Sequence, residues 1–494
     1  MPWRDLRKLC TIWGLFKMSN TYLPSIGIET HVQLKTRTKL FSAVGNDARG
    51  AQPNSLISHI DAGLPGALPV LNKEALKLVV LAGLALNGEI QPFSRFDRKH
   101  YFYPDLPKGY QISQYEQPLV LGGHVNINVG GREKRVGLVR AHLEEDAGKN
   151  IHPPGADYSL VDLNRAGTPL LEIVSQPDIH TPADAKAYAR ELYLLMKYAG
   201  VSDADMYHGN MRFDINVSLS KEAGKLGIRT EVKNLNSFRS VEAAVAYEIK
   251  RQTELLDKGS EVLQETRGWD EAKQKTTSQR GKEEAHDYRY MPEPDIPPIE
   301  LDESYVTDVK SELPDLPSDV RAKLREIRID DKVAEDLLDR PDALKHTLEV
   351  LGQAQPEDAR RTAFWLIHSE PALVDDPGFR GLKIEAGQLI KLSKMVDEGV
   401  LNSTAAKQVF DEMQKTNDDP ADIASRLDLH QLGDEAEIKK MVSVVLADNP
   451  KAAADVKAGQ DKAIGFLVGQ VMQKSGGKAN PEAAARIIKK QLGI

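Results

Sequence analysis

Residues 212–237 read RFDINVSLSKEAGKLGIRTEVKNLNS, and this stretch predicts two β-strands joined by a glycine-containing turn. Apolar and polar residues alternate along it, and successive side chains of a strand point to opposite faces of a sheet. One predicted face is apolar and consists of Phe213, Ile215, Val217 and Leu219. The other is polar and mostly charged: Arg212, Asp214, Asn216, Arg229, Glu231 and Lys233. An ordinary solvated face is the alternative, because antiparallel sheets commonly keep one side in water.

The same alternation occurs in two other segments, GIETHVQLK (27–35) and GLVRAHLEEDAGK (137–149). Their expected core residues are Ile28, Val32, Leu34, Val139, Ala141 and Leu143. Their expected polar residues are Glu29, His31, Gln33, Lys35, Arg140, His142 and Glu144, with Glu145 and Asp146 at the end of the second segment. Three polar strand faces, two of which combine Glu with His, predict one shared cleft.

Such a cleft suits a divalent cation. Magnesium binds carboxylate oxygens, keeps several waters and bridges to substrate phosphates. An imidazole at His31 would suit zinc equally well. A hydrogen-bonded strand histidine is the alternative for His31 taken alone, and the coincidence with Glu29, Glu144, Asp214 and Glu231 favours the metal.

The composition describes an ordinary protein of about three domains, because 494 residues are too many for one core. A net charge of −8 argues against indiscriminate coating of nucleic acid, yet residues 451–494 form a basic end that could dock on RNA. The single cysteine, Cys10, excludes an internal disulfide and a Cys-rich zinc site. No run approaches the roughly 20 apolar residues that cross a bilayer.

The predicted fold class is α+β with a largely antiparallel sheet, because short strands and a few helices are interspersed up to about residue 300. The clearest helix spans 182–199 with Thr181 as N-cap, and a second spans about 241–258. The proline cluster at 291–302 closes this unit, and helical periodicity dominates beyond it. The predicted boundaries give an N-terminal extension (1–20), a first domain (21–308), a helical domain (309–416) and a small helical tail domain (417–494). No glycine-rich phosphate loop of the GxxxxGK[ST] or GxGxxG type occurs.

Two loops and a turn add groups that could bind a nucleotide. The loop 98–118 offers Tyr101 and Tyr103 for stacking on a base, together with Lys108. The loop 266–295 contains several Arg and Lys, among them Arg289, although a solvated basic loop is the alternative. The turn around Gly167 carries Arg165. Basic groups around metal-binding carboxylates are what phosphoryl transfer requires, since they neutralise charge on phosphate oxygens.

Seven motifs stand in order along the chain: GIETHVQLKT, FYPDLPKGYQISQ, HLEEDAGK, DLNRAGTPLLEIVSQPD, EVKNLNS, DYRYMPEPDIPP and GFLVGQVMQKSGGKANP. Together they resemble the B-subunit family of glutamyl/aspartyl-tRNA amidotransferases over residues 22–494. No domain is inserted in the helical half, so the resemblance is to the bacterial and organellar type.

The resemblance implies a cradle domain related to glutamine synthetase and guanidino kinases, a helical domain, and a tail domain of YqeY type. It implies phosphorylation by ATP and Mg²⁺ of the side-chain carboxylate of Glu on tRNA(Gln) or Asp on tRNA(Asn), followed by amidation. An amidase subunit would supply the ammonia and a small C subunit would complete a heterotrimer. The implied location is the bacterial cytoplasm, with organellar import as the alternative. In that case we expect translation to start at Met18, with residues 1–17 upstream of this start.

The resemblance also implies site residues. The implied catalytic residues are Glu29, His31, Glu144, Glu145, Asp214, Glu231 and Lys233. The implied metal ligands are Glu29, His31, Glu144, Glu145 and Glu231, and the nucleotide contacts are Lys108, Arg165 and Arg289. The expected tRNA contacts are Tyr101, Tyr103, Lys474 and Lys478.

One segment departs from the family pattern. Many relatives bind a structural zinc through four cysteines, and here the matching positions hold Ser42, Val44, Ser58 and Asp61. We therefore expect no zinc. A non-catalytic tRNA-binding scaffold is the competing function, favoured by the basic tail and the aromatic loop.

Overall fold

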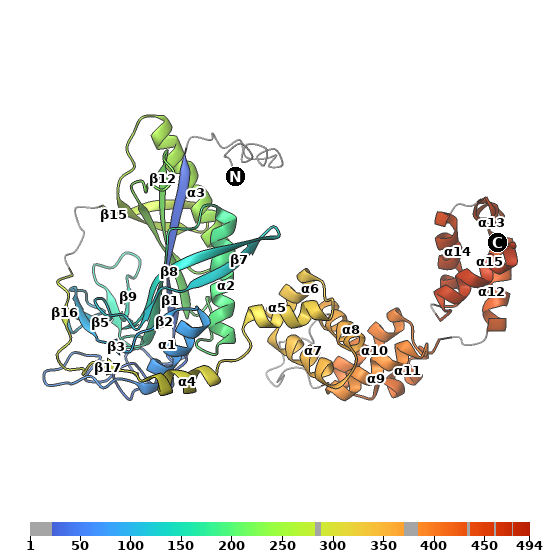
Figure 1. Cartoon of the computed structure of the whole chain (residues 1–494), viewed down its shortest axis with the longest axis horizontal. Coiled ribbons are helices and arrows are strands. Elements are labelled where there is room, and N and C mark those ends of the chain that lie inside the picture. The colour runs from blue at the N-terminus through green and yellow to red at the C-terminus, as the bar shows by residue number, and fades with distance from the viewer. Residues whose placement is uncertain (1–21, 282–287, 370–383, 432–434, 459–460, 477) are drawn as a thin grey trace. The chain divides into compact units, whose positions relative to one another are not determined.

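The computed structural model describes residues 22–281, 288–369, 384–431, 435–458, 461–476 and 478–494 (Figure 1). The predicted N-terminal extension, residues 1–20, lies outside the described residues. The chain divides into two compact units, one ending at Pro317 and one running from Ser318 to Ile494.

A ten-stranded sheet organises the first unit. Its order is β15 (Lys275–Gly281), β14 (Glu265–Asp270), β13 (Thr230–Leu235), β12 (Met211–Ser220), β1 (Leu23–Gln33), β11 (Pro169–Ser175), β8 (Arg132–Glu145), β6 (Val120–Leu121) and β2 (Glu89–Ile90), with β7 (His124–Val129) paired to β8. Neighbouring strands are antiparallel except β13 and β14, which are parallel. Helix α3 (Phe238–Asp257) supplies the crossover that a parallel pair needs. The sheet is therefore mixed but largely antiparallel, as predicted.

Smaller sheets complete this unit: β16 (Met291–Pro292), β4 (Asp97–His100) and β5 (Tyr110–Ser113) in one, β9 (Lys149–Ile151) and β10 (Leu160–Asp162) in another, and β3 (Phe93–Ser94) with β17 (Ile299–Glu300) in a third. The proline cluster at 291–302 thus contributes two short strands.

Helices α2 (Pro182–Tyr198) and α3 lie along the sheet (Figure 1) and bury its apolar face. The ring of Phe238 in α3 lies 6.5 Å from that of Phe213 in β12. Phe213, Ile215 and Val217 are fully buried in one core with Ile28 and α2 residues, so the predicted alternation is confirmed. The charged residues of the same strands consequently share the opposite face.

The helix ends follow local chemistry. The Thr181 hydroxyl accepts a hydrogen bond from the Asp184 amide at the start of α2, as predicted for an N-cap. Helix α3 begins three residues earlier than expected, because Ser237 caps it by accepting from the Ser240 amide.

The prediction that Val139 is a core residue is wrong. Its side chain is exposed, whereas Leu138 is buried. The pairing of β8 with β11 shifts register between Val174 and Ser175, so that Ser175 lies opposite Leu138 and Val174 opposite Arg140. A β-bulge therefore turns Val139 outward, and simple alternation does not encode it.

The expected end of the first domain, between residues 308 and 309, falls inside α4 (Glu303–Ser311). This helix packs on the first unit: Val309 belongs to its core, and Glu312 pairs with Lys77 of α1 (Lys73–Ala85) at 2.6 Å. The unit accordingly extends to Pro317.

The second unit consists of helices in its described parts: α5 (Pro317–Glu326), α6 (Asp331–Leu338), α7 (Pro341–Gln353), α8 (Pro356–His368), α9 (Ala386–Asp397), α10 (Ser403–Thr416), α11 (Pro420–Arg426), α12 (Glu435–Asp448), α13 (Pro450–Lys457), α14 (Asp461–Lys474) and α15 (Pro481–Leu492). The expected seam at 417–420 is a helix-capping turn, with Asn417 in the left-handed conformation. Asp419 there pairs with Lys391 of α9 at 2.7 Å, which ties the turn to the preceding helices. A separate hydrophobic core of the last helices begins at Ile438.

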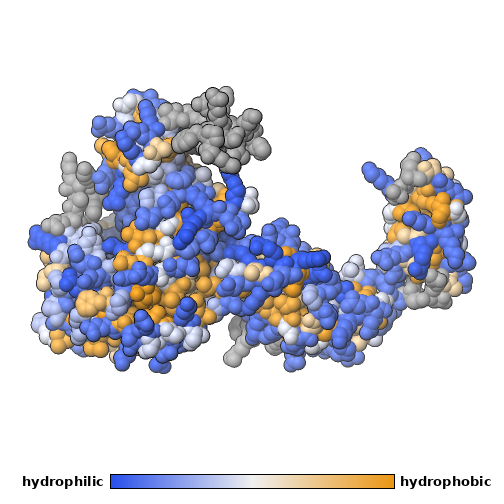
Figure 2. Space-filling model, in the orientation of Figure 1, coloured by the Kyte–Doolittle hydropathy of each residue, from blue (hydrophilic) through white to orange (hydrophobic). Residues whose placement is uncertain are grey.

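Figure 2 shows mostly hydrophilic residues on the visible face of each unit, interrupted by hydrophobic areas. Among the described residues, no helix is both long and apolar enough to cross a membrane.

Candidate active site

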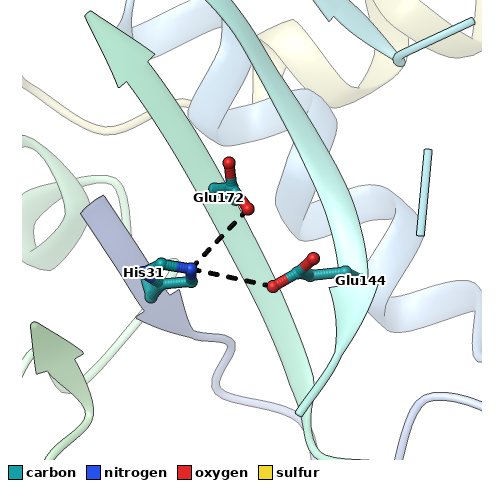
Figure 3. A group of neighbouring side chains, drawn as sticks. All are labelled: His31, Glu144 and Glu172. Carbon is teal, nitrogen blue, oxygen red and sulfur yellow. Dashed lines mark ion pairs between the residues drawn. The ribbon is translucent and has the colours of Figure 1, made fainter. Parts of the chain in front are cut away.

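Three adjacent strands bring one histidine and two glutamates together on the polar face of the large sheet (Figure 3). His31 of β1 lies opposite Glu172 of β11, and Glu172 lies opposite His142 of β8. Glu144 follows His142 on the same face, because residues two apart in a strand point the same way. The strand order β1-β11-β8 thus assembles the cluster His31, Glu144 and Glu172.

The geometry of this cluster fits a cation. His31 Nε2 lies 3.8 Å from Glu144 Oε1 and 3.6 Å from Glu172 Oε2, and the ligand atoms of all three residues lie within 4.8 Å of one another. Octahedral ligands about 2.1 Å from a magnesium ion are separated by about 3 to 4.2 Å. The distances from His31 to both carboxylates fall in that range and exceed ordinary hydrogen-bond lengths.

The charged groups of the cluster shift one another's pKa values. Burial alone would lower the pKa of His31, but Glu172 and Glu144 outweigh it and raise this pKa. Burial would likewise raise the pKa of Glu172, but His142 and His31 hold it below its ordinary value. Burial lowers the pKa of His142, whose Nε2 lies 3.7 Å from Glu172 and 3.9 Å from Glu144. His142 thus lies beside both carboxylates of the cluster.

A second acidic group adjoins the first on β1, β12 and β13. Glu29 lies opposite Asp214, and Asn216 donates to Glu29 Oε1 at 3.0 Å. Burial, followed by repulsion from Glu172, Glu231 and Asp214, raises the pKa of Glu29. Lys233 Nζ lies 3.1 Å from Glu231 and 3.5 Å from Asp214 and supplies the positive charge of this group.

Two arginines converge on one buried carboxylate at the end of β8. Arg165 Nε lies 2.8 Å from Asp146 Oδ2, and Arg212 Nη2 lies 3.4 Å from Asp146 Oδ1. Burial would raise the pKa of Asp146, but Arg212 and Arg165 lower it. Acidic and basic groups thus lie close together on the polar sheet face and at its edge, and such groups could bind a metal ion and phosphate.

Comparisons with known proteins show the family of the chain. The sequence model described as the GatB/GatE catalytic domain matches residues 24–307, and that described as the GatB domain matches residues 349–492. The chain is 43% identical over 474 residues to a Caldicellulosiruptor saccharolyticus protein, covering 94% of this chain and 98% of the relative. It is 45% identical over 477 residues to a Coxiella burnetii protein, covering 95% and 99%. Both relatives are named as the B subunit of an aspartyl/glutamyl-tRNA(Asn/Gln) amidotransferase.

The chain belongs to the amidotransferase B-subunit family.

Within this B-subunit chain, most of the sequence-predicted catalytic residues lie on one face. His31 and Glu144 share the three-residue cluster, and Glu29 and Asp214 lie beside it. Glu231 belongs to the second acidic group, where it also accepts a hydrogen bond from Thr266 at 2.8 Å. Their individual roles stay predictions.

Glu145 lies apart from the three-residue cluster, contrary to the expectation that it shares the metal with Glu144. It points to the opposite side of β8, because consecutive strand residues alternate. Its carboxylate pairs with Lys108 and accepts the Ile112 amide at 2.9 Å. Lys108, expected at the nucleotide, is thus engaged with Glu145.

Several tyrosines lie near the cleft, since the charges of Glu144 and Glu172 act on Tyr290. Tyr115 and Tyr290 stack with ring centroids 4.0 Å apart. Lys99 Nζ lies 4.9 Å from the Tyr288 ring, and burial would lower its pKa, but Glu144 and the groups around it raise that pKa. Tyr101 lies 6.4 Å from the Tyr288 ring.

The other expected contacts lie as follows. Tyr103 is exposed. Arg289 has a positive φ of 43°, and its carbonyl oxygen lies 3.0 Å from His100 Nδ1. Lys474 pairs with Asp448 at 3.2 Å and Lys478 pairs with Asp428. Their expected contacts with tRNA stay predictions.

Sequence reasoning missed Glu172 as a member of the cluster. It is the one acid of β11, whose sequence PLLEIVS is otherwise mostly apolar. A lone carboxylate in a buried strand needs a partner, and this is the signal that could have identified it. The predicted face of His142 is confirmed, because His142 lies opposite Glu172.

Proposed function

We propose that this chain activates the side-chain carboxylate of glutamate or aspartate carried by tRNA(Gln) or tRNA(Asn), using ATP and Mg²⁺. The relatives' names supply the substrate class, and the convergence of His31, Glu144 and Glu172 carries the proposal. The resemblance implies that the first domain is related in fold to glutamine synthetase and guanidino kinases, and such a fold would fit the same chemistry.

The residues of the cleft would have different roles. His31, Glu144 and Glu172 would hold the ion, with the adjacent acidic group of Glu29, Asp214 and Glu231 as further oxygen donors. Bound Mg²⁺ would neutralise charge on the phosphates of ATP. Lys233 and the arginines at Asp146 would stabilise negative charge on the transferred phosphoryl group.

The proposed reaction has two steps. A carboxylate oxygen of the aminoacyl group attacks the γ-phosphorus of ATP, the bond to the β-phosphate oxygen breaks, and ADP leaves. Ammonia then attacks the acyl carbon, phosphate leaves, and the amide remains on the tRNA after loss of a proton.

Other subunits would supply the nitrogen. Cys10 is the only cysteine of the sequence, and no Ser-Ser-Lys amidase signature occurs in it. We therefore assign glutamine hydrolysis to a partner amidase subunit, with a small C subunit in the same heterotrimer. The basic tail would contact the tRNA.

The test is phosphate release from ATP by the assembled complex with misacylated tRNA. Glu144→Ala and Glu231→Ala should each abolish most of the tRNA-dependent release, whereas Glu222→Ala, an exposed residue after β12, should not. Unchanged release in both cleft variants would instead support the scaffold function, in which loss of the residues after Pro420 alone abolishes activity.

A further inference from the structure

A buried ion pair lies outside the catalytic residues named above. Lys39 Nζ lies 3.1 Å from Asp61 Oδ2, and both side chains are almost completely removed from solvent. Lys39 also donates to the Leu56 carbonyl at 2.7 Å, and Asp61 accepts the Ser58 amide at 2.8 Å. Burial lowers the pKa of Lys39 although Asp61 opposes this change.

The pair lies directly against the turn that carries Arg165. Gly167 of that turn has a φ of +80°, and a Cβ atom there would overlap Asp61 Oδ1, so only glycine fits. The Leu40 amide donates to the Gly167 carbonyl at 2.8 Å. The backbone next to Lys39 is therefore bonded to the same turn that Asp61 contacts.

Side-chain amides connect the same two segments a second time. The Leu56 amide donates to Asn164 Oδ1 at 2.8 Å, and Asn164 Nδ2 donates to the Gln52 carbonyl at 2.7 Å. The Leu163 amide donates to Asn54 Oδ1 at 2.8 Å. Because Leu56 bonds both Lys39 and Asn164, the ion pair and the amides form one connected network.

The same turn leads into the cleft. The Gly167 amide donates to the Asp146 carbonyl at 2.9 Å, and Arg165 Nε reaches the Asp146 carboxylate at 2.8 Å. Asp146 in turn lies 3.4 Å from Arg212 on the polar sheet face. A displacement of Gly167 would therefore be passed on to Arg165 and Asp146 through these bonds.

We propose that Lys39 and Asp61 are positioning residues that hold the Asn164–Thr168 turn so that Arg165 is presented to the cleft. The inference rests on the proposed function, in which Arg165 stabilises the transferred phosphoryl group. A buried ion pair adds little net stability compared with apolar residues of similar size, so a requirement for defined geometry explains it better.

The test uses Asp61→Asn in the full-length chain within the assembled amidotransferase. We expect kcat for tRNA-dependent ATP cleavage to fall about 10- to 100-fold, the scale of a misplacement of about 1 Å, with KM for ATP changed less than about twofold. The matched control is Asp203→Asn, which removes an exposed ion pair with Lys35 at 2.9 Å and should have no effect.

A double-mutant cycle separates positioning from general stabilisation. In an Arg165→Ala background, Asp61→Asn should lower kcat by less than about twofold, because the group it positions is absent. Equal losses in both backgrounds, or no loss on Arg165→Ala alone, would overturn the proposal. If Asp61→Asn folds poorly, the apolar pair Lys39→Met with Asp61→Leu restores packing without the hydrogen bonds, and a wild-type kcat in that variant would also overturn it.

Amide hydrogen exchange distinguishes failure of this inference from failure of the proposed function, because it does not depend on catalysis. Amides of residues 163–168 should exchange faster in Asp61→Asn than in the unsubstituted chain. Unchanged exchange would overturn the inference even if Glu144→Ala abolishes ATP cleavage. Faster exchange in Asp61→Asn, together with full activity in Glu144→Ala, would count against the proposed function alone.

Discussion

Glu144→Gln should weaken metal binding to the cleft while leaving the fold intact. The substitution keeps the shape of a side chain that is almost fully buried and removes its charge. Glu144 Oε1 lies 3.8 Å from His31 Nε2, and its Oε2 accepts a hydrogen bond from Ser113 at 3.3 Å. A glutamine can retain these contacts in part, so the loss should report chiefly the missing charge.

The expected magnitude follows from the charge and its distance. Two unit charges 4 Å apart interact by about 4 kcal/mol at an effective dielectric constant of about 20. A divalent ion gains more, but dehydration of both ion and carboxylate offsets most of this attraction. We expect a net loss of roughly 1.4 to 2.8 kcal/mol, which corresponds to a 10- to 100-fold higher Kd.

The assay is a titration with Mn²⁺ as a paramagnetic probe, followed by the Mg²⁺ concentration that half-saturates ATP cleavage. Glu145→Gln is the matched control, because it is the same substitution one residue along the same strand. Glu145 faces the other way and pairs with Lys108. A loss of Mn²⁺ affinity in Glu145→Gln as large as in Glu144→Gln would refute the assignment of the two carboxylates.

Three further outcomes are expected. Burial raises the pKa of Tyr290 from 10.0 to about 12; Lys99 opposes this change, whereas Glu144 and Glu172 add to it. The folded chain therefore keeps this proton to higher pH than the unfolded chain, and the stability that it contributes is lost as pH rises from about 10 to about 12. A difference ultraviolet titration against Tyr290→Phe should show the delayed ionisation. Replacement of Lys474 and Lys478 by alanine should weaken tRNA binding and reduce its salt slope by up to about 2, because each phosphate contact releases counterions; an unchanged slope would contradict their role. Phe213→Ala should lower the free energy of unfolding of the first unit by about 3 to 5 kcal/mol, since its ring is fully buried, and denaturant unfolding monitored in that unit would measure it.

Strand periodicity predicted which side chains share a face but not which strands are neighbours. Phe213 and Ile28 proved buried because alternation in a sheet is a local property of the backbone. The assembly of His31 with Glu172 depends on β1 lying between β11 and β12, and these strands are far apart in sequence. Pairing of that kind depends on the complete fold, so sequence reasoning inferred a shared cleft without its third member.

The wrong predictions have two physical causes: an irregularity in the backbone of β8, and the alternation of consecutive residues between the two faces of a strand. Val139 is exposed because a bulge interrupts the alternation of β8, and a bulge depends on the partner strand as much as on its own residues. The motif predicts that Glu145 lies with Glu144 because the two acids are adjacent in sequence, whereas adjacent strand residues face opposite sides. In the sequence Asp61 is distinguished only as a departure from the family's cysteines, because its pairing with Lys39 depends on the complete fold.

The central position of β1 has a consequence for biosynthesis. This strand is translated first among the ten, yet its two hydrogen-bonding neighbours, β11 and β12, emerge from the ribosome much later. At about 5 to 20 residues per second, the delay before β12 is complete is on the order of 10 to 40 seconds. During that interval a strand with an unburied apolar face and both edges unpaired is open to aggregation, so nascent chains of this protein should depend on chaperones until residue 220 is available.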